Sequence, residues 1–249
     1  MLYRRRVIPP RLVELWGLTP QLASALARKE SGDCSRCGAK LRARRLAQVL
    51  LWLYPVGHPP APARSLARWV EHPEIQALRV AEINRIDGLH EELARLPKFS
   101  SSDYQPGAQP GAIVDGVRCE DLTHLTYPNA SFDLVLTSET LEHVPDLMAA
   151  LHEIHRVLVP GGRHIFTIPL LPGVAETFTR SRVRPDGSIE DLATRICHPG
   201  GDVGYPVFTE FGADLPLLFE RAGFELDVFF GPNCTQDLAQ VYVCRKTPD

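Results

Sequence analysis

The stretch that decides the fold is Phe132-Asp-Leu-Val-Leu-Thr-Ser-Glu-Thr-Leu-Glu-His-Val-Pro-Asp146. Its first part, Phe132–Thr137, is a short apolar run after a turn, which predicts a buried strand. The following segment, Asp146–Leu158, has apolar residues at helical spacing, and Pro160-Gly-Gly162 ends it. Arg163–Pro169 then predicts another strand. A strand, a helix and a strand in succession favour two parallel neighbours in one sheet.

The same alternation extends along most of the chain. It predicts an α/β fold, with a parallel sheet covered by helices on both faces and a ligand site at the carboxyl ends of the strands. The predicted strands are Leu78–Asn84, Phe99–Tyr104, Val114–Cys119 and, as a terminal antiparallel pair, Glu225–Phe230 and Gln240–Cys244. The other predicted helices are 11–18, 22–29, 41–54, 64–76, 89–96 and 215–222.

Composition supports a folded globular protein. The 249 residues are 44% hydrophobic and 23% charged, which excludes a disordered polymer and a collagen-like fibre. The longest early apolar run, Val49–Tyr54, is too short to cross a bilayer, and no signal-peptide pattern precedes it. We therefore expect a cytoplasmic protein without membrane contact, whose six cysteines are mostly free thiols.

Charge is distributed unevenly. Residues 1–50 hold 11 of the 27 Lys and Arg residues but only 3 of the 30 Asp and Glu residues. We expect residues 1–76 to form a basic helical extension with a proline-rich linker at 55–62, and residues 77–249 to form the main domain, with a lid-like insertion at about 170–215. The basic run Lys40–Arg45 favours docking against the acidic body over nucleic-acid binding. The sequence predicts no oligomeric state.

Residues 117–146, residues 150–169 and Glu220-Arg-Ala-Gly-Phe224 together resemble the class I S-adenosylmethionine-dependent methyltransferases. The resemblance covers roughly residues 77–245. It implies a Rossmann-like, seven-stranded sheet that is mostly parallel with an antiparallel C-terminal strand. It also implies S-adenosyl-L-methionine as cofactor and methyl transfer as the reaction.

The resemblance places the cofactor at a loop after the first strand of the domain. In the family this strand ends in an acid and a glycine-rich loop, where glycines allow close approach of the backbone. Here Glu82 and Gly88 match the pattern, whereas Asn84 and Ile86 stand at the other glycine positions. Asn tolerates left-handed backbone better than a β-branched residue does. We therefore expect a reshaped loop, and this change favours weaker cofactor binding.

Further cofactor contacts follow from the ends of the next strands. Asp103 stands 21 positions after Glu82 and matches the acid that binds the ribose hydroxyls, with a solvated loop acid as the alternative. Glu120, Asp121 and Leu122 match the adenine-contacting position, although an Asx turn explains them equally. Ser138 and Glu139 match the segment beneath the methionine part. The predicted cofactor-binding residues are thus Glu82, Asn84, Gly88, Asp103, Glu120, Asp121, Leu122, Ser138 and Glu139.

His143 is the predicted catalytic residue, since imidazole titrates near neutrality and can act as a base. A packed structural histidine is the alternative. His198 and Tyr205, in the predicted lid, are the candidate substrate-binding residues. Four arginines of the lid could grip an anionic substrate or form a solvated loop: Arg180, Arg182, Arg184 and Arg195.

Cys34-Ser-Arg-Cys37-Gly38 is half of a zinc ribbon. Structural zinc takes four ligands, and the sequence has no second pair at this spacing. Cys34 and Cys37 are candidate metal ligands, but the pattern favours a vestigial knuckle over a zinc site or a redox pair.

These features predict a methyltransferase that acts on an oxygen or nitrogen of a small molecule or biosynthetic intermediate. The alternative is a non-catalytic scaffold or regulatory subunit with weakened cofactor binding, because two loop glycines are replaced. A nucleic-acid methyltransferase using the basic extension is a third hypothesis.

Overall fold

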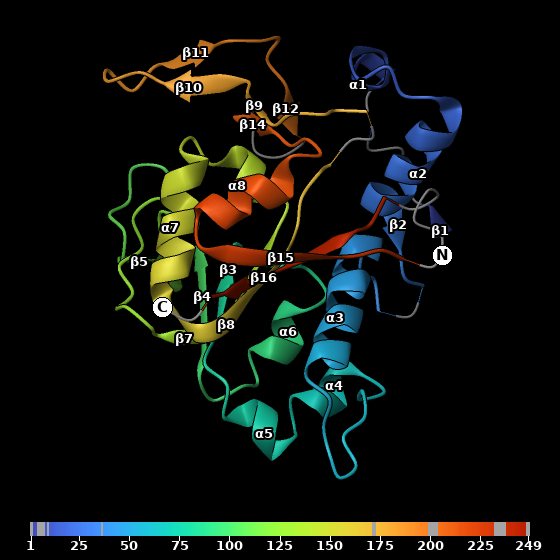
Figure 1. Ribbon diagram of the computed structural model, residues 1–249, viewed down its shortest axis with the longest axis vertical. Coiled ribbons are helices and arrows are strands. Elements are labelled where there is room, and N and C mark those ends of the chain that lie inside the picture. Colours follow the sequence, from blue (N-terminus) through green and yellow to red (C-terminus); the bar gives the residue numbers. More distant parts are fainter. Residues whose placement is uncertain are drawn as a thin grey trace.

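A computed structural model describes residues 2–3, 8, 10–35, 37–170, 173–198, 204–231 and 238–247. Its centre is an eight-stranded sheet in the order β15-β16-β8-β7-β3-β4-β6-β5 (Figure 1). The strands are β3 (Val80–Ile83), β4 (Phe99–Asp103), β5 (Ile113–Val114), β6 (Val117–Cys119), β7 (Phe132–Ser138), β8 (Leu158–Thr167), β15 (Phe224–Phe229) and β16 (Val241–Lys246).

Most neighbouring strands run parallel. β3 pairs in parallel with β4 and β7, β4 with β6, and β7 with β8. β16 is antiparallel to both β8 and β15. This arrangement confirms the predicted Rossmann-like sheet with an antiparallel C-terminal strand.

The eighth strand comes from a hairpin where one continuous strand was expected at 114–119. Val114 pairs with Val117, and the two residues between them, Asp115 and Gly116, have φ values of 50° and 80°. An Asp-Gly pair with two positive φ values forms a tight hairpin turn. The single-strand prediction is therefore wrong, and the short edge strand β5 is added.

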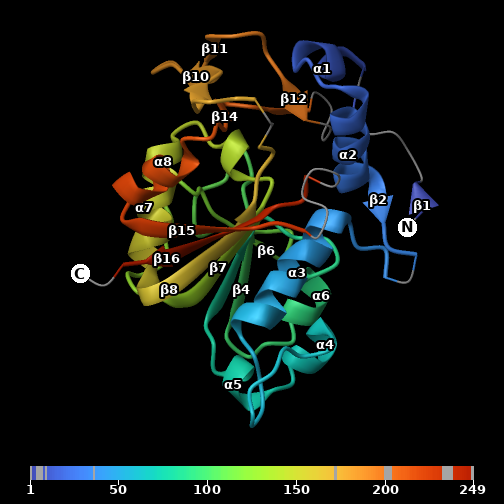
Figure 2. The ribbon, with the colours of Figure 1, turned by 45° about the vertical axis from the view of Figure 1, so that its right-hand side comes forward.

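Helices cover both faces of the sheet (Figure 2). On one face α7 (Leu147–Val157) and α8 (Leu215–Arg221) pack on a core that includes Val135. On the other face α3 (Leu41–Leu53) and α6 (His90–Leu93) pack on a core that includes Leu134 and Leu136. The alternation of these three β7 residues follows the two-residue period of a strand.

The N-terminal part contributes to these layers. The expected single helix at 64–76 is two short helices, α4 (Leu66–Trp69) and α5 (Pro73–Gln76), because Pro73 favours the start of a new helix. Both share a core with the sheet. The remaining elements are β1 (Leu2–Tyr3), α1 (Pro10–Leu15), α2 (Pro20–Ser31) and β2 (Gly32–Asp33). The domain boundary at residue 76 stays a prediction.

The segment after β8, expected as a lid-like insertion, contains three two-stranded pairs. These pairs are β9 (Phe178–Thr179) with β14 (Thr209–Glu210), β10 (Ser181–Val183) with β11 (Ile189–Asp191), and β12 (Cys197–His198) with β13 (Tyr205–Pro206). Figures 1 and 2 show β10, β11, β12 and β14 above the central sheet, at the same end of the molecule as α1. Phe208 N–H donates to the Glu142 carbonyl, 2.8 Å away, so this segment contacts the short turn that follows β7.

Candidate active site

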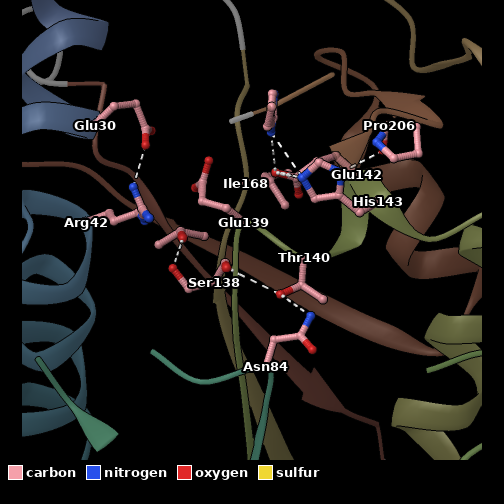
Figure 3. A network of polar contacts seen from close by, with 12 residues as sticks. Glu30, Arg42, Asn84, Ser138, Glu139, Thr140, Glu142, His143, Ile168 and Pro206 are labelled. Carbon is pink, nitrogen blue, oxygen red and sulfur yellow. Dashed lines mark hydrogen bonds and ion pairs between the residues drawn. The ribbon is translucent and has the colours of Figure 1, made fainter. Parts of the chain in front are cut away.

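The sheet reverses its order between β3 and β7. From β3 the chain passes through β4 and β6 on one side and then returns to β7 on the other. Ligands of such sheets bind at the carboxyl ends of the strands at this point. A side-chain hydrogen bond crosses it, because Asn84 Nδ2 after β3 donates to Thr140 Oγ1 after β7, 3.4 Å away (Figure 3).

Glu82 organises the loop after β3. Its side chain is fully buried. Oε1 accepts from the N–H of Ile86 at 3.2 Å, and Oε2 accepts from Ser101 Oγ at 3.1 Å and contacts His90 Nδ1. The acid therefore ties the loop to β4 and α6.

The glycine positions of this loop are filled in three different ways. Asn84 adopts the left-handed region with φ 61°, so the backbone shape that a glycine would give is kept. Ile86 is instead 3% exposed and belongs to the core beneath α3. Gly88 has φ 87°, and a Cβ placed there would lie 2.5 Å from Ala39 Cβ. The N-terminal segment thus packs directly on the third glycine position.

Asp103, at the end of β4, and Glu120, just after β6, differ in how many of their carboxylate oxygens accept hydrogen bonds from the chain. Asp103 Oδ1 accepts from the N–H of Arg85, 2.9 Å away, and no donor among the described residues contacts its Oδ2. Buried Glu120 accepts from Arg118 Nε at 2.6 Å and from the N–H of Thr126 at 2.9 Å, so both of its oxygens are engaged.

The residues after Glu120 turn away from the strand. Asp121 Oδ1 accepts from the N–H and Oγ1 of Thr123 at 2.8 and 2.7 Å, which is the Asx turn weighed above. Leu122 is 5% exposed and packs in the core.

At the end of β7 an N-terminal lysine enters the site. Glu139 has φ 51°, an uncommon conformation for a residue other than glycine. Lys29 of α2, 1% exposed, lies with Nζ 3.0 Å from Glu139 Oε1 and donates to the Ile168 carbonyl at 3.2 Å. Beside them, Ser138 Oγ lies 2.8 Å from Thr167 Oγ1.

The charges around Glu139 are balanced by the N-terminal extension. Burial alone would raise the pKa of Glu139, but the charges of Lys29 and Arg42 outweigh it and lower that pKa. Arg42 in turn pairs with Glu30 (Figure 3). The carboxylate at the end of β7 is therefore ionised and ion-paired at neutral pH.

A second group of polar side chains lies near Glu139. The short 3-10 turn η1 (Leu141–His143) carries Glu142 and His143, and β12 brings His198 against them. His143 Nε2 is 3.1 Å from His198 Nδ1, and each of these nitrogens is 3.6 Å from Glu142 Oε1. His143 Nδ1 donates to the Pro206 carbonyl at 2.7 Å, since a carbonyl can only accept (Figure 3).

Burial sets the protonation of this group. Burial, reinforced by the neighbouring charge of Glu139, raises the pKa of Glu142 well above its usual range. Burial lowers the pKa of His143, and burial together with His143 lowers the pKa of His198 to about 4. Both imidazoles are consequently uncharged at neutral pH.

The lid residues proposed from the sequence separate into two sets. The Tyr205 ring centroid lies 5.9 Å from that of His143, and the tyrosine is 56% exposed. The four arginines are instead engaged within the lid: Arg180 pairs with Glu210, Arg182 and Arg184 with Glu190, and Arg195 with Asp191. Arg180 is buried, and the other three arginines are exposed. All four are paired with acids of the lid, which does not favour an anion grip.

The cysteine pair forms a turn. The N–H of Gly38 donates to the Cys34 carbonyl at 2.8 Å, with Cys34 partly buried and Cys37 exposed. Within the described ranges, no group of potential metal ligands includes either cysteine. Cys234 lies outside those ranges. The neighbouring Lys40 pairs with Asp33, so the basic run engages its own extension.

Sequence reasoning missed Lys29. The signal was present, because Leu22, Leu26 and Lys29 follow the i, i+4, i+7 spacing of one helix face. A lysine on an otherwise apolar stripe indicates a buried ionic partner. Its partner, Glu139, could be identified only from the tertiary structure.

Comparison with known proteins supports the resemblance stated above. A family model described as "Methyltransferase domain" matches residues 76–166. Methyltransferase GfsG of Streptomyces halstedii is 30% identical over 106 residues, covering 43% of this chain and 33% of that protein. Malonyl-[acyl-carrier protein] O-methyltransferase of Halorhodospira halophila is 35% identical over 89 residues, covering 33% and 30%. The chain therefore spans about a third of the length of these relatives.

A solved structure of an S-adenosylmethionine-dependent methyltransferase from Mesorhizobium loti aligns with 72% of this chain and 97% of its own, at 19% identity and a TM-score of 0.45. The fold assignment rests on the strand order of the central sheet and not on this structural similarity. Among the described residues, no helix combines the length and apolar character needed to cross a membrane.

Proposed function

We propose that this chain, whose residues 76–166 form a methyltransferase domain of the class I S-adenosylmethionine-dependent family, transfers a methyl group to an oxygen or nitrogen of a small molecule. The observation that carries the proposal is this family match on a sheet whose order reverses at β3 and β7. The alternative of a non-catalytic scaffold is not favoured, because the relatives that match are named as methyltransferases.

The residues at the switch point fit the cofactor. Asn84 keeps the left-handed backbone of the first glycine position, and Asp103 has one carboxylate oxygen available for a ribose hydroxyl. In this proposal Asp103 binds the ribose, Asp121 and Leu122 border the adenine, and Ser138 and Glu139 lie beneath the methionine part. Glu82 and Glu120 support the loops behind these contacts.

S-adenosyl-L-methionine supplies a methyl group on a sulfonium, which transfers in line to a nucleophile. The chain has to position the acceptor and exclude water. His143 is the proposed residue that activates the acceptor, because its Nδ1 is held by Pro206 and its Nε2 faces His198 and Glu142. Tyr205 and His198 border the acceptor on the lid side.

The acceptor class is proposed from the relatives. One is named as a malonyl-[acyl-carrier protein] O-methyltransferase, and another, 49% identical over 43 residues, as a 27-O-demethylrifamycin SV methyltransferase. Acceptors of this kind favour a small-molecule or biosynthetic intermediate rather than nucleic acid. The cytoplasmic location expected from the sequence belongs to the same proposal.

Calorimetric titration of the full chain with S-adenosyl-L-methionine tests this function. We expect saturable binding at one site. Incubation with candidate hydroxyl acceptors should then give products heavier by one methyl group in a mass spectrum. A folded sample that takes up neither S-adenosyl-L-methionine nor S-adenosylhomocysteine at high protein concentration would contradict the proposal.

A further inference from the structure

The geometry points to a binding site for a divalent transition-metal ion formed by Glu142 Oε1, His143 Nε2 and His198 Nδ1. Figure 3 shows Glu142 and His143 side by side. These three residues come from η1 and β12, which lie 55 positions apart in the chain. Two imidazole nitrogens and one carboxylate oxygen form a ligand set that suits zinc and its neighbours in the first transition row.

The spacing of the three atoms already matches coordination. They form a triangle with sides of 3.1, 3.6 and 3.6 Å. A point equidistant from all three lies about 2.0 Å from each, which is the usual length of a zinc–imidazole or zinc–carboxylate bond. The three ligand atoms would not have to move to bind an ion at this point. The ion would keep at least one further coordination position for an oxygen ligand.

The second observation is Glu142 itself. Its side chain is fully buried, and neither carboxylate oxygen has a hydrogen-bond partner among the described residues. A buried carboxylate without donors is costly, and such groups are normally paired or coordinate a metal. The nearest cationic side chains are committed elsewhere, since Lys29 pairs with Glu139 and Arg42 with Glu30.

The surroundings of His143 provide the support that metal-binding histidines usually have. Such a histidine donates its other ring N–H to a carboxylate or backbone carbonyl, which fixes the ring and its tautomer. His143 Nδ1 makes this bond to Pro206 at 2.7 Å. Nε2 is therefore the nitrogen with a free lone pair, and it is the one that faces Glu142 and His198.

The position of the site suggests what the ion does. Glu142 and His143 lie three to five positions beyond Ser138 and Glu139, next to the proposed methyl donor. With His143 Nε2 bound to it, the ion would activate the acceptor in place of a free imidazole. Its open coordination position would hold an acceptor oxygen and make the hydroxyl more acidic. This role rests on the proposed function, whereas binding of the ion does not.

Metal binding is tested on the purified, metal-stripped full chain, with Zn²⁺ in calorimetry and Co²⁺ in visible absorption. We expect one ion per chain and visible Co²⁺ bands typical of nitrogen and oxygen ligands. The Cys34→Ser/Cys37→Ser double variant should retain this ion. Exposed His152→Ala on α7 serves as the matched histidine control and should also retain it.

The ligand variants His198→Ala and Glu142→Gln should weaken Zn²⁺ binding by at least ~100-fold, beyond the effect of losing an outer hydrogen-bond partner. Glu142→Gln also distinguishes a metal ligand from a structural acid. It removes a buried acid whose oxygens accept no hydrogen bond among the described residues, so it should leave the metal-free protein at least as stable in urea. Binding that survives both ligand variants, that is lost with the two cysteines, or that is absent altogether would overturn the proposal. S-adenosylhomocysteine titration of the same samples tests the proposed function separately.

Discussion

Lys29 of α2 and Glu139 at the end of β7 form a buried ion pair, 3.0 Å apart, across 110 positions of sequence. The pair joins the basic N-terminal extension to the acidic sheet. It also lies where the proposed methyl donor would be bound, so the extension is part of the candidate site.

Breaking this pair should be costly. Lys29→Met leaves Glu139 with only the charge of Arg42, and Glu139→Gln leaves Lys29 with only Glu30, 3.6 Å away. Each variant should lower the free energy of unfolding, by up to roughly 3–5 kcal/mol. The double variant should lose less than the sum of the two, because neither charge remains unpaired. Urea denaturation of the four proteins measures the coupling. The exposed pair Arg245–Glu225 is the control and should show a coupling below about 1 kcal/mol. Strictly additive losses at Lys29 and Glu139 would contradict the pairing.

Substitution of Gly88 should detach the cysteine loop. In Gly88→Ala the new Cβ would meet Ala39 Cβ at 2.5 Å and would also strain a backbone at φ 87°. We expect faster amide hydrogen exchange in residues 33–40 and a loss of roughly 1–3 kcal/mol of stability from the clash. Gly187→Ala, at φ 82° with no atom within 4 Å, measures the backbone strain alone. Equal effects of the two variants would show that Ala39 does not pack there.

Asp103 should decide the affinity for the cofactor. Asp103→Ala removes a carboxylate that the proposed ribose hydroxyls would contact, so S-adenosylhomocysteine should bind about 10- to 100-fold more weakly. Calorimetry measures the change. Asp186→Ala, an exposed turn acid in the lid that bonds Ser188, should bind as the unmodified chain does. Unchanged affinity in Asp103→Ala would remove this acid from the proposed site.

Stability should fall in mild acid because of His164. This imidazole is fully buried, with Nε2 2.9 Å from Thr137 Oγ1, and burial lowers its pKa to about 3. The unfolded chain, with a pKa near 6.5, binds the proton first. The His164 contribution is therefore fully present above pH 6.5 and is lost as the pH falls toward 3.

Between pH 6.5 and 4.5 this residue alone should cost about 2–3 kcal/mol. Urea denaturation at several pH values, compared with His164→Gln, measures it. The variant should lack this part of the acid loss, whereas exposed His152→Gln should keep it. Parallel pH profiles for the unmodified chain and His164→Gln would refute the assignment.

Much of the architecture follows from local patterns. The apolar run at Phe132–Thr137 and the helix at Asp146–Leu158 lie close to β7 and α7 as observed. The next strand was expected to begin at Arg163, after Pro160-Gly-Gly162, but β8 begins at Leu158 and includes these three residues. The face of each helix or strand that is buried sets the spacing of its apolar residues, so this spacing can be recognised in a single sequence. The Asp115-Gly116 hairpin was equally local and could have been predicted from its turn residues.

By itself, the sequence determined the strand–helix alternation, the family resemblance and the acids Glu82 and Asp103 near the ends of β3 and β4. Only the tertiary structure decided that Lys29 meets Glu139 and that His198 meets Glu142 and His143. Periodicity reports which face of an element is buried, because burial acts on neighbouring turns of the same segment. Periodicity carries no information about which distant segment supplies the partner of a buried side chain. Here β12 supplies His198 and helix α2 supplies Lys29, because the whole fold packs them against the end of the sheet.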